Sequence, residues 1–354
     1  MGKVRTIGFL CMRFEANEKR DFRPAFFQRL ANLDAHLILE ESYGSKLGFS
    51  ANDYIKVNKR IKFCSRDEVF ASDCVVTVRT PDFTQLEKLK PGAILFSMLH
   101  YLTRERRNRF LTERSIRMYS MDSVVDDFGV RMIQDFPGTV ENAFHAANSL
   151  LPREKTSEPL RVLILGSGEI GKLAANTAIK FTDRPVVVSI VGRSVTRDPK
   201  LLDPLLKESD ILVDASKRHE PWKSIISNHQ LALLPEDALI VDLSVDDYDV
   251  NISPIQVKGI EGIPTGNLDK YVFFPQDEAY KSIPPEVDST NRRILLSCNA
   301  WPGVDPNRCL DRYETQLDPF IRLLARDLPE PSLDSNNPYE RALARGSYAY
   351  FLRS

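Results

Sequence analysis

An unbroken apolar run followed by three regularly spaced glycines is the feature that most constrains how this chain can fold. Val162 to Leu165 reads as a strand covered on both faces, and Gly166, Gly168 and Gly171 follow in the G-x-G-x-x-G spacing. The first glycine permits a tight turn, the second lets backbone approach a pyrophosphate, and the third lets a helix pack on the strand. The pattern predicts a strand–turn–helix unit that binds a dinucleotide; the alternative is a glycine-rich turn that binds nothing.

The backbone amides at the start of that helix are the expected phosphate ligands. Besides the three glycines, the turn and the first helical residues are Ser167, Glu169 and Ile170. Helix N-termini present N–H groups without an intrahelical partner, which favours bound anions. Farther along the chain, Ser216 follows the apolar run that ends at Asp214, and we expect this loop to touch the nicotinamide ribose.

The end of the next predicted strand, Val186 to Val191, indicates which dinucleotide is bound. An NAD-binding protein usually offers Asp or Glu there to the ribose diol. This chain instead offers Arg193, Ser194 and Arg197. A guanidinium and a hydroxyl would bind a 2′-phosphate, which a carboxylate would repel. NADP(H) is therefore preferred, and NAD(H) is the alternative if Arg193 is an ordinary solvated loop residue.

Strand-like and helix-like segments alternate in both halves of the chain. This pattern predicts an α/β protein with two Rossmann-like domains, each built on a parallel sheet, and an inter-domain cleft. A length of 354 residues also favours two domains. The polar, proline-bounded segment 152–159 reads as a linker, and the C-terminal helical segments have nothing left to cover on the second sheet. We expect a substrate-binding, catalytic domain formed by residues 1–155 and 299–354, and a dinucleotide-binding domain formed by residues 156–298.

Composition narrows the class of protein. A formal net charge of −1 argues against nucleic-acid or membrane-surface partners. No apolar run approaches the roughly 20 residues that span a bilayer, and the N-terminus opens as a strand rather than a signal peptide. The five cysteines form no C-x-x-C pair, which is typical of reduced thiols in a cytoplasmic protein without a metal site. A homo-oligomer is compatible with the sequence.

Three polar residues of the first half stand where predicted strands end. Arg20 follows the first strand, Arg79 ends another, and His100 ends the next. Two guanidiniums could clamp a substrate carboxylate, and a histidine could move the proton that accompanies a hydride. The alternatives are surface ion pairs for the arginines and a backbone-bonded strand end for His100.

The order of these parts resembles the alanine dehydrogenase and transhydrogenase family, which includes the lysine-forming saccharopine dehydrogenases and carboxyethylornithine synthase. The family pattern N-E-x-R, V-K-x-P and L-H is matched by Asn17-Glu18-Lys19-Arg20, Val78-Arg79-Thr80-Pro81 and Leu99-His100. Residues 41–54 and 65–68 look closest to carboxyethylornithine synthase. The resemblance implies that Arg20 binds the substrate carboxylate and that His100 serves the carbonyl or imine.

The chain departs from the family pattern at two places. The family usually has Lys where this chain has Arg79, and arginine keeps its proton, so Arg79 could bind and polarise a substrate but hardly act as a base. His100 would then carry the proton alone or with Asp122, which loosely matches a family acidic residue. Alanine dehydrogenases also place an aspartate near the cofactor late in the second domain, whereas Asn291-Arg292-Arg293 has none. This disfavours alanine deamination.

The resemblance implies an oxidoreductase that moves a hydride between NADP(H) and the carbon of a C–N bond in an amino acid. We expect reductive condensation of a 2-oxo acid with an amino acid, as in carboxyethylornithine synthase and other opine-type enzymes, or reduction of an imine. The partners would then be small molecules, an amino acid and a 2-oxo acid. Two alternatives stay open: an amino-acid dehydrogenase of the alanine dehydrogenase type that releases ammonia, and a non-catalytic NADP(H)-binding sensor.

Overall fold

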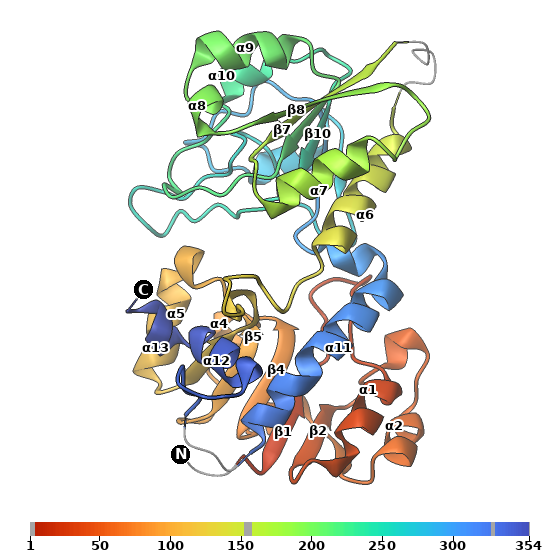
Figure 1. Ribbon diagram of the computed structural model, residues 1–354, viewed down its shortest axis with the longest axis vertical. Helices are drawn as coiled ribbons and strands as arrows, with labels where there is room; N and C mark the ends of the chain where they lie inside the picture. Colours follow the sequence, from red (N-terminus) through yellow and green to blue (C-terminus); the bar gives the residue numbers. More distant parts are fainter. Residues whose placement is uncertain (1–3, 152–157, 327–329, 354) are drawn as a thin grey trace. The chain divides into compact units, whose positions relative to one another are not determined.

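The computed structural model describes residues 4–151, 158–326 and 330–353, and the chain divides into two compact units. Unit 1 comprises Met1–Phe14, Glu18–Asp135 and Pro306–Ser354; unit 2 comprises Glu15–Asn17 and Phe136–Asp305. Each unit is built on one six-stranded sheet with helices packed against it (Figure 1). The α/β class with two Rossmann-like domains is therefore confirmed.

The sheet of unit 1 is parallel and has the strand order β3-β2-β1-β4-β5-β6. Because β2 lies on one side of β1 and β4 on the other, the direction of strand addition reverses between β1 and β4. Open α/β sheets bind ligands beyond the carboxyl ends of the strands at such a switch point. The strands are β1 (Thr6–Phe9), β2 (His36–Glu40), β3 (Ile61–Cys64), β4 (Cys74–Arg79), β5 (Ile94–Met98) and β6 (Arg117–Ser120).

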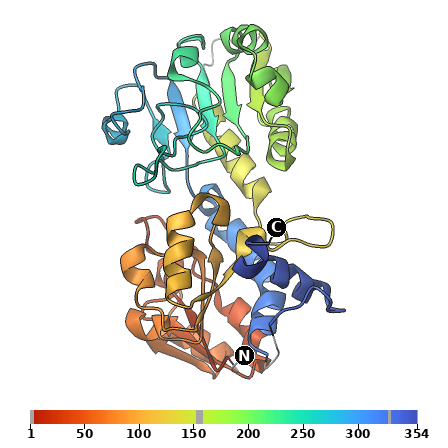
Figure 2. The ribbon, with the colours of Figure 1, turned by 90° about the vertical axis from the view of Figure 1, so that its left-hand side faces the viewer.

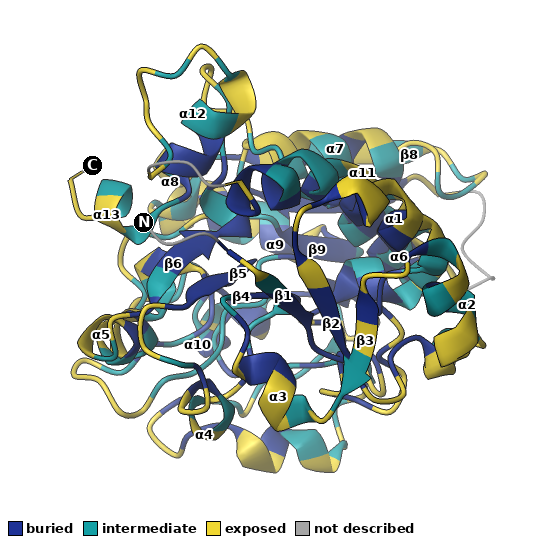
Figure 3. Ribbon diagram, turned by 90° about the horizontal axis from the view of Figure 1, so that it is seen from below, coloured by how far each residue is buried: buried dark blue, intermediate teal, exposed yellow. Residues whose placement is uncertain are grey.

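Helices cover both faces of this sheet, because successive strand residues point to opposite sides. Phe96 of β5 belongs to a cluster with α1, α2, α11 and α12, whereas its neighbour Leu95 packs with α3, α4 and α5 (Figures 2 and 3). The helices are α1 (Pro24–Arg29), α2 (Ala51–Val57), α3 (Arg66–Phe70), α4 (Phe83–Leu86), α5 (Glu105–Glu113), α11 (Pro306–Leu324), α12 (Pro338–Arg345) and α13 (Tyr348–Phe351), with 3₁₀ turns η1 (Leu30–Asn32), η2 (Ser45–Leu47), η3 (Tyr101–Thr103) and η4 (Met121–Ser123).

The sheet of unit 2 has the order β11-β12-β10-β9-β7-β8 and is parallel except for β11, which runs antiparallel to β12. Its switch point lies between β7 and β9, because β8 pairs with β7 on the other side. The strands are β7 (Leu160–Leu165), β8 (Val186–Val191), β9 (Ile211–Asp214), β10 (Leu239–Asp242), β11 (Val272–Phe273) and β12 (Ile294–Ser297).

Unit 2 also has one hydrophobic cluster on each side of its sheet. Ile164 of β7 packs with α6 and α7, and the adjacent Leu163 packs with α9 and α10. The described residues contain no helix long and apolar enough to cross a membrane. The helical segments are α6 (Phe136–Asn148), α7 (Glu169–Ala178), α8 (Arg193–Thr196), α9 (Pro199–Lys207), α10 (Asn228–Leu231), η6 (Glu278–Ser282) and η7 (Trp301–Val304).

The division into units falls at other residues than the sequence predicts. We expected boundaries at 155/156 and 298/299, whereas unit 2 runs from Phe136 to Asp305. The reason is packing: Phe144 of α6 and Trp301 of η7 both belong to the core of unit 2. Trp301 also donates from Nε1 to the Asp242 carbonyl at 3.0 Å. Residues 152–157 of the predicted linker lie outside the described residues.

Candidate functional site

The glycine-rich turn of unit 2 lies at the switch point between β7 and β9. Gly166 has a φ of +105°, and a Cβ added there would lie 2.6 Å from the Ala215 carbonyl oxygen, in the loop after β9. A Cβ on Gly171 would lie 1.9 Å from the Gly166 carbonyl oxygen. These two glycines are therefore required by the backbone conformation and by close packing of the turn on the helix.

Gly168 differs from the other two glycines, because a Cβ added there would meet nothing within 4 Å. It precedes α7 as the N-cap residue, and Ser167, Gly168 and Glu169 are exposed. Local packing thus leaves open space at Gly168, and the N–H groups of the first turn of α7, including those of Glu169 and Ile170, have no intrahelical acceptor. This geometry fits a pyrophosphate that approaches the backbone.

The three residues expected to select the cofactor follow the end of β8. Arg193 and Ser194 begin α8, Arg197 is its C-cap residue, and all three are exposed. The next acidic residue along the chain is Asp198, whose side chain caps α9 by accepting from the Lys200 N–H at 3.0 Å. Residues 192–197 therefore offer guanidinium and hydroxyl groups but no carboxylate.

Behind the turn, two carboxylates and a lysine are buried at the carboxyl ends of β9 and β10. Asp214 and Asp242 are each 1% exposed, and Lys258 is also 1% exposed. The Lys258 Nζ lies 3.2 Å from Asp242 Oδ2 and donates to the Asp246 carbonyl at 2.7 Å. Burial, with the nearby Asp242 carboxylate, raises the pKa of Asp214 to about 6.

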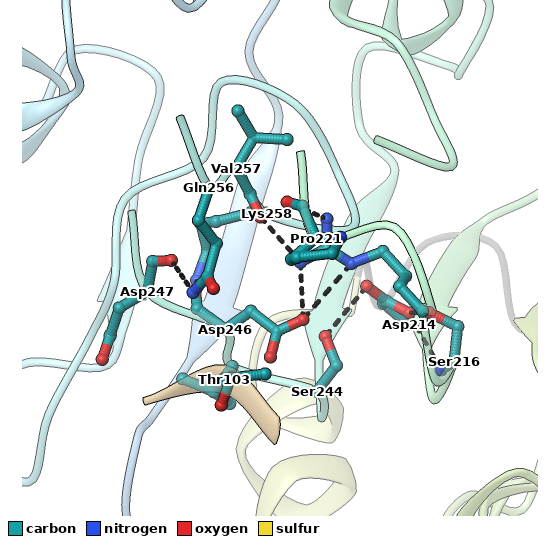
Figure 4. A network of polar contacts seen from close by, with 12 residues as sticks. Thr103, Asp214, Ser216, Pro221, Ser244, Asp246, Asp247, Gln256, Val257 and Lys258 are labelled. Atoms are coloured by element: carbon teal, nitrogen blue, oxygen red, sulfur yellow. Dashed lines mark hydrogen bonds and ion pairs between the residues drawn. The ribbon is translucent and has the colours of Figure 1, made fainter. Parts of the chain in front are cut away.

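Ser216, expected near the nicotinamide ribose, turns its hydroxyl inward. Its Oγ donates to Asp214 Oδ1 at 2.6 Å, and its N–H donates to the same oxygen at 3.0 Å. Ser244, from the loop after β10, donates to the other Asp214 oxygen at 3.0 Å (Figure 4). Asp214 thus accepts hydrogen bonds from the loops after β9 and after β10.

Arg218, in the loop after β9, is linked to the loop after β10 by an ion pair. It lies 2.6 Å from Asp246 Oδ2 and donates to the carbonyls of Pro221, Lys223 and Val257. Asp246 and Val257 are drawn in Figure 4.

Asp214 and Asp242 were not among the site residues expected from the sequence. Each is the last residue of an apolar, strand-like run, and this position could have indicated them. No local pattern points to Lys258.

In unit 1 the structure brings Arg20 and Arg79 together through Glu18. Glu18 is fully buried and accepts from Arg20 at 2.5 and 3.0 Å and from Arg79 Nη1 at 3.0 Å. Burial would raise the pKa of Glu18, but the two guanidiniums outweigh it and lower that pKa. Two guanidiniums, one from the segment after β1 and one from the end of β4, therefore share the Glu18 carboxylate.

The two arginines differ in access. Arg20 is 3% exposed and directs its fork at Glu18; burial would lower the pKa of Arg20, but the Glu18 carboxylate outweighs burial and raises it. The Arg79 side chain is 20% exposed, and its guanidinium carbon lies 4.4 Å from the centre of the Phe14 ring. Of the two guanidiniums, that of Arg79 is therefore the more exposed, and both contact the Glu18 carboxylate.

His100 and Asp122 form a second pair at the same edge of the sheet. Arg79 lies in register with Met98, two residues before His100. The His100 N–H donates to Asp122 Oδ1 at 3.0 Å, and its Nδ1 lies 3.6 Å from Asp122 Oδ2. The imidazole is half exposed, whereas Asp122 is mostly buried and also accepts from the Ser120 hydroxyl at 2.5 Å. Burial would raise the pKa of Asp122, but His100 and other neighbours lower it.

His100 has left-handed backbone angles, with φ of +46° and ψ of +56°. Such a conformation is uncommon for a residue other than glycine and has to be held by its surroundings. Here the Asp122 carboxylate holds the His100 amide. Within residues 4–151, 158–326 and 330–353, no cluster of three His, Cys, Asp or Glu side chains could bind a metal ion.

Comparison with known proteins shows which families this chain is similar to. Residues 15–134 match the family model of the alanine dehydrogenase/PNT N-terminal domain. The chain is 21% identical over 251 residues to an alanine dehydrogenase of Halomonas elongata, covering 63% of this chain and 68% of that protein. It is 24% identical over 168 residues to an NAD(P) transhydrogenase subunit alpha of Haemophilus influenzae, covering 44% of this chain and 32% of that protein.

Solved structures show the same fold. An L-alanine dehydrogenase aligns with a TM-score of 0.66 at 16% identity, covering 97% of this chain and 94% of that one. A transhydrogenase of Sinorhizobium meliloti aligns with a TM-score of 0.62 at 15% identity, covering 90% of this chain and 94% of that one. These matches support a relationship to the alanine dehydrogenase/transhydrogenase-type family, whose N-terminal domain model matches residues 15–134 of this chain.

Proposed function

We propose that this chain is a nicotinamide-dependent oxidoreductase that acts on the C–N bond of an amino acid. The observation that carries the proposal is the Arg20–Glu18–Arg79 cluster, which leaves one partly exposed guanidinium at the ligand-binding edge of unit 1. The same chain carries a dinucleotide-type turn in unit 2. A carboxylate-binding group and a dinucleotide site are the two things that an amino-acid dehydrogenase needs.

The cofactor would be held by unit 2. The first-turn amides of α7 would bind its pyrophosphate, and the open space at Gly168 lets that group approach. We infer NADP(H) rather than NAD(H), because Arg193, Ser194 and Arg197 are exposed beyond β8 and no carboxylate stands among them. The bound nicotinamide supplies or accepts the hydride.

The substrate would be held and protonated by unit 1. Arg79 would bind its carboxylate, since Glu18 and the Phe14 ring fix the guanidinium in place before the ligand arrives. Arg20 would act as a positioning residue behind Glu18. His100 would give or take the proton at the nitrogen-bearing centre, and Asp122 would orient the imidazole and favour its protonated form.

The nitrogen donor of the reaction could be ammonia or an amino acid, and we favour ammonia. The sequence features closest to carboxyethylornithine synthase serve the fold: the Tyr43 hydroxyl accepts from the Phe22 N–H at 2.9 Å, and the Tyr54 hydroxyl donates to the Phe22 carbonyl at 2.9 Å. Ser65 and Glu68 form the capping box of α3. These residues therefore give no support to an amino-acid donor, whereas one relative and one solved structure carry the name alanine dehydrogenase.

The test is a binding and turnover screen. The purified protein is titrated with NADPH and NADH by fluorescence and then given 2-oxo acids with ammonium or with amino acids, while nicotinamide absorbance is followed. We expect NADPH oxidation that requires both an oxo acid and ammonium. Oxidation only with an amino-acid donor would support reductive condensation instead.

The Arg79→Ala variant helps to distinguish a catalytic oxidoreductase from a non-catalytic NADP(H)-binding sensor. It should raise KM for the oxo acid at least tenfold and leave NADPH affinity unchanged, because Arg79 lies in the other unit from the dinucleotide turn. Arg60→Ala is the matched control, since Arg60 forms an exposed ion pair with Asp34 in unit 1. Tight NADPH binding without oxidation across the whole panel would favour a non-catalytic sensor and overturn the proposal.

A further inference from the structure

The peptide group between Leu99 and His100 is held at both of its polar atoms. Its carbonyl, that of Leu99, accepts a hydrogen bond from Arg107 Nη2 of α5. Its N–H, that of His100, donates to Asp122 Oδ1 at 3.0 Å. The pairing of β5 with β6 ends at Ser120, whose Oγ accepts from the Leu99 N–H at 2.9 Å. Side chains therefore hold the backbone here in place of a sheet partner.

These contacts fix the left-handed backbone of His100, which has φ of +46° and ψ of +56°. A planar peptide group that is bonded at its C=O and at its N–H can hardly rotate, and that rotation is what changes φ of the next residue. On the other side of His100, its carbonyl accepts from the Thr103 N–H at 3.0 Å, and the Tyr101 carbonyl accepts from Asn108 Nδ2 at 2.8 Å. Arg107 and Asn108 are consecutive in α5, so one helix holds the chain before and after His100.

Arg107 is a costly donor for a backbone carbonyl. It makes no ion pair within the described part of the chain, and its buried Nε has no hydrogen-bond partner there. Burial, together with the charge of Arg104, lowers the pKa of Arg107 to about 10. A neutral donor could bond the Leu99 carbonyl at a lower cost in desolvation. The positive charge of Arg107 therefore requires a role beyond this hydrogen bond.

The charge of Arg107 acts on the imidazole of His100. Burial lowers the pKa of His100, the Asp122 carboxylate raises it, and the guanidiniums of Arg131, Arg104 and Arg107 lower it. Asp122 belongs to η4, Arg131 follows the loop after η4, Arg104 is the N-cap residue of α5, and Arg107 lies within α5. Arg107 and Asp122 thus hold the same peptide group but have opposite effects on the imidazole proton.

We propose that Arg107 is a positioning residue for His100, which fixes the Leu99–His100 peptide group and keeps the imidazole ready to release its proton. Because the C=O and N–H of a trans peptide point in opposite directions, Arg107 and Asp122 hold this group from opposite sides. The inference rests on the proposed function, in which His100 gives or takes the proton at the nitrogen-bearing centre. Arg107 acts through His100 and does not bind the substrate itself.

The first test is the pH profile of kcat/KM. Arg107→Gln removes the cation, so the pKa that governs the profile should rise, opposite to the change expected for Asp122→Asn. We expect kcat to fall at least about tenfold, because His100 is less well held, while KM for the oxo acid stays the same. Arg107→Lys keeps the charge with fewer donors, and should keep the wild-type pKa and recover part of kcat. Arg109→Gln is the matched control, because Arg109 lies in the same helix and forms an exposed ion pair with Glu105.

The second test measures the pKa of His100 without a substrate. The protein has five histidines, and an NMR titration in which His100 is assigned with the His100→Asn variant follows its imidazole directly. A wild type that binds NADPH without turnover would overturn the proposed function, whereas the NMR titration would still test the role of Arg107. Circular dichroism checks that the variants are folded, and if Arg107→Gln is not, Arg107→Lys decides through a lower kcat at an unchanged His100 pKa.

Three results would overturn the inference. One is an unshifted His100 pKa in folded Arg107→Gln, and another is an unchanged kcat in that variant when the wild type is active. The third is a change in Arg109→Gln as large as that in Arg107→Gln, which would mean that any positive charge of α5 has the same effect.

Discussion

Arg218 and Asp246, from the loops after β9 and β10, are joined by an ion pair with 2.6 Å between Nη2 and Oδ2. The Arg218 side chain is 6% exposed and also donates to three backbone carbonyls. A guanidinium can satisfy this many acceptors because its five N–H groups form a rigid fork. Two loops at the carboxyl edge of the unit 2 sheet are therefore held by one side chain.

Replacement of Arg218 by lysine should destabilise unit 2 although the charge is kept. An ammonium group cannot reach Asp246 and the three carbonyls together, so buried acceptors lose their donors at a cost of about 1–3 kcal/mol in the free energy of unfolding. Both tryptophans, Trp222 and Trp301, belong to unit 2, so urea unfolding followed by tryptophan fluorescence reports this unit.

The matched control for this change is Arg161→Lys, because Arg161 forms an exposed ion pair with Glu208 in the same unit. This control should change the free energy of unfolding, measured by fluorescence, by less than about 0.5 kcal/mol. Equal changes in the free energy of unfolding for Arg218→Lys and Arg161→Lys would mean that the guanidinium network does not hold the loops.

Replacement of Glu18 by glutamine should destabilise unit 1. The variant leaves Arg20, which is 3% exposed, without a counter-charge, and removal of one member of a buried ion pair costs about 3–5 kcal/mol. Circular dichroism reports both units, whereas tryptophan fluorescence reports unit 2. We therefore expect an earlier transition in circular dichroism with little change in fluorescence.

Asp34→Asn controls for the loss of a carboxylate, because Asp34 is 74% exposed and pairs with the exposed Arg60. It should change the free energy of unfolding by less than about 1 kcal/mol. If Glu18→Gln were no more destabilising than this control, the buried cluster would not be held together by the Glu18 charge.

The elements that could be predicted from the sequence are those with a local physical cause. The apolar runs before Gly166, at 211–214, at 239–243 and at 294–297 form β7, β9, β10 and β12, because strands buried on both faces need unbroken apolar sequence. The positions of Arg79 and His100 at strand ends are likewise predicted, because each residue follows an apolar run. Both residues come to one edge of the sheet because β4 and β5 are parallel neighbours.

What could not be predicted depends on contacts between distant segments. The sequence places Glu18 two residues before Arg20, but only the folded chain shows that Arg79 shares the same carboxylate. Lys258 has no local pattern that indicates burial, and it is buried because Asp242 and the Asp246 carbonyl accept from it. The apolar positions of α6 likewise do not indicate which sheet the helix covers.

Replacement of Asp122 by asparagine should lower the pKa that governs turnover. The Asp122 carboxylate, 3.6 Å from His100 Nδ1, favours the protonated imidazole, so its removal favours the neutral form. Burial already lowers the pKa of His100 and Asp122 acts against that shift, so we expect the pKa in the pH profile of kcat/KM to fall further and kcat/KM itself to fall about tenfold. Glu113→Gln removes an exposed carboxylate of α5 and should leave the profile unchanged. An unshifted profile in Asp122→Asn would exclude His100 as the titrating group.

Replacement of Asp214 by asparagine should stabilise unit 2 at high pH. Burial and the Asp242 charge raise the pKa of Asp214 from 3.8 to about 6, so the native state binds its proton more tightly than the unfolded state does. The ionised carboxylate therefore lowers stability above about pH 6, and this loss is relieved as the pH falls from 6 toward 4. At about 1.4 kcal/mol for each pKa unit, removal of the charge should raise the free energy of unfolding by at most about 3 kcal/mol at pH 8.

The gain should shrink as the pH falls to 5, where wild-type Asp214 is itself largely protonated. Urea unfolding followed by tryptophan fluorescence at both pH values measures the difference between variant and wild type within unit 2. The measurement has to report unit 2 alone, because burial also raises the pKa of Asp21, in unit 1, to about 6. The exposed Glu220, changed to glutamine, serves as the control and should show no such pH dependence. An Asp214→Asn variant that is less stable than wild type at pH 8 would contradict this prediction. It would mean that the folded protein stabilises the ionised Asp214 carboxylate through its donors Ser216 and Ser244 and through the charge of Lys258, which pairs with Asp242.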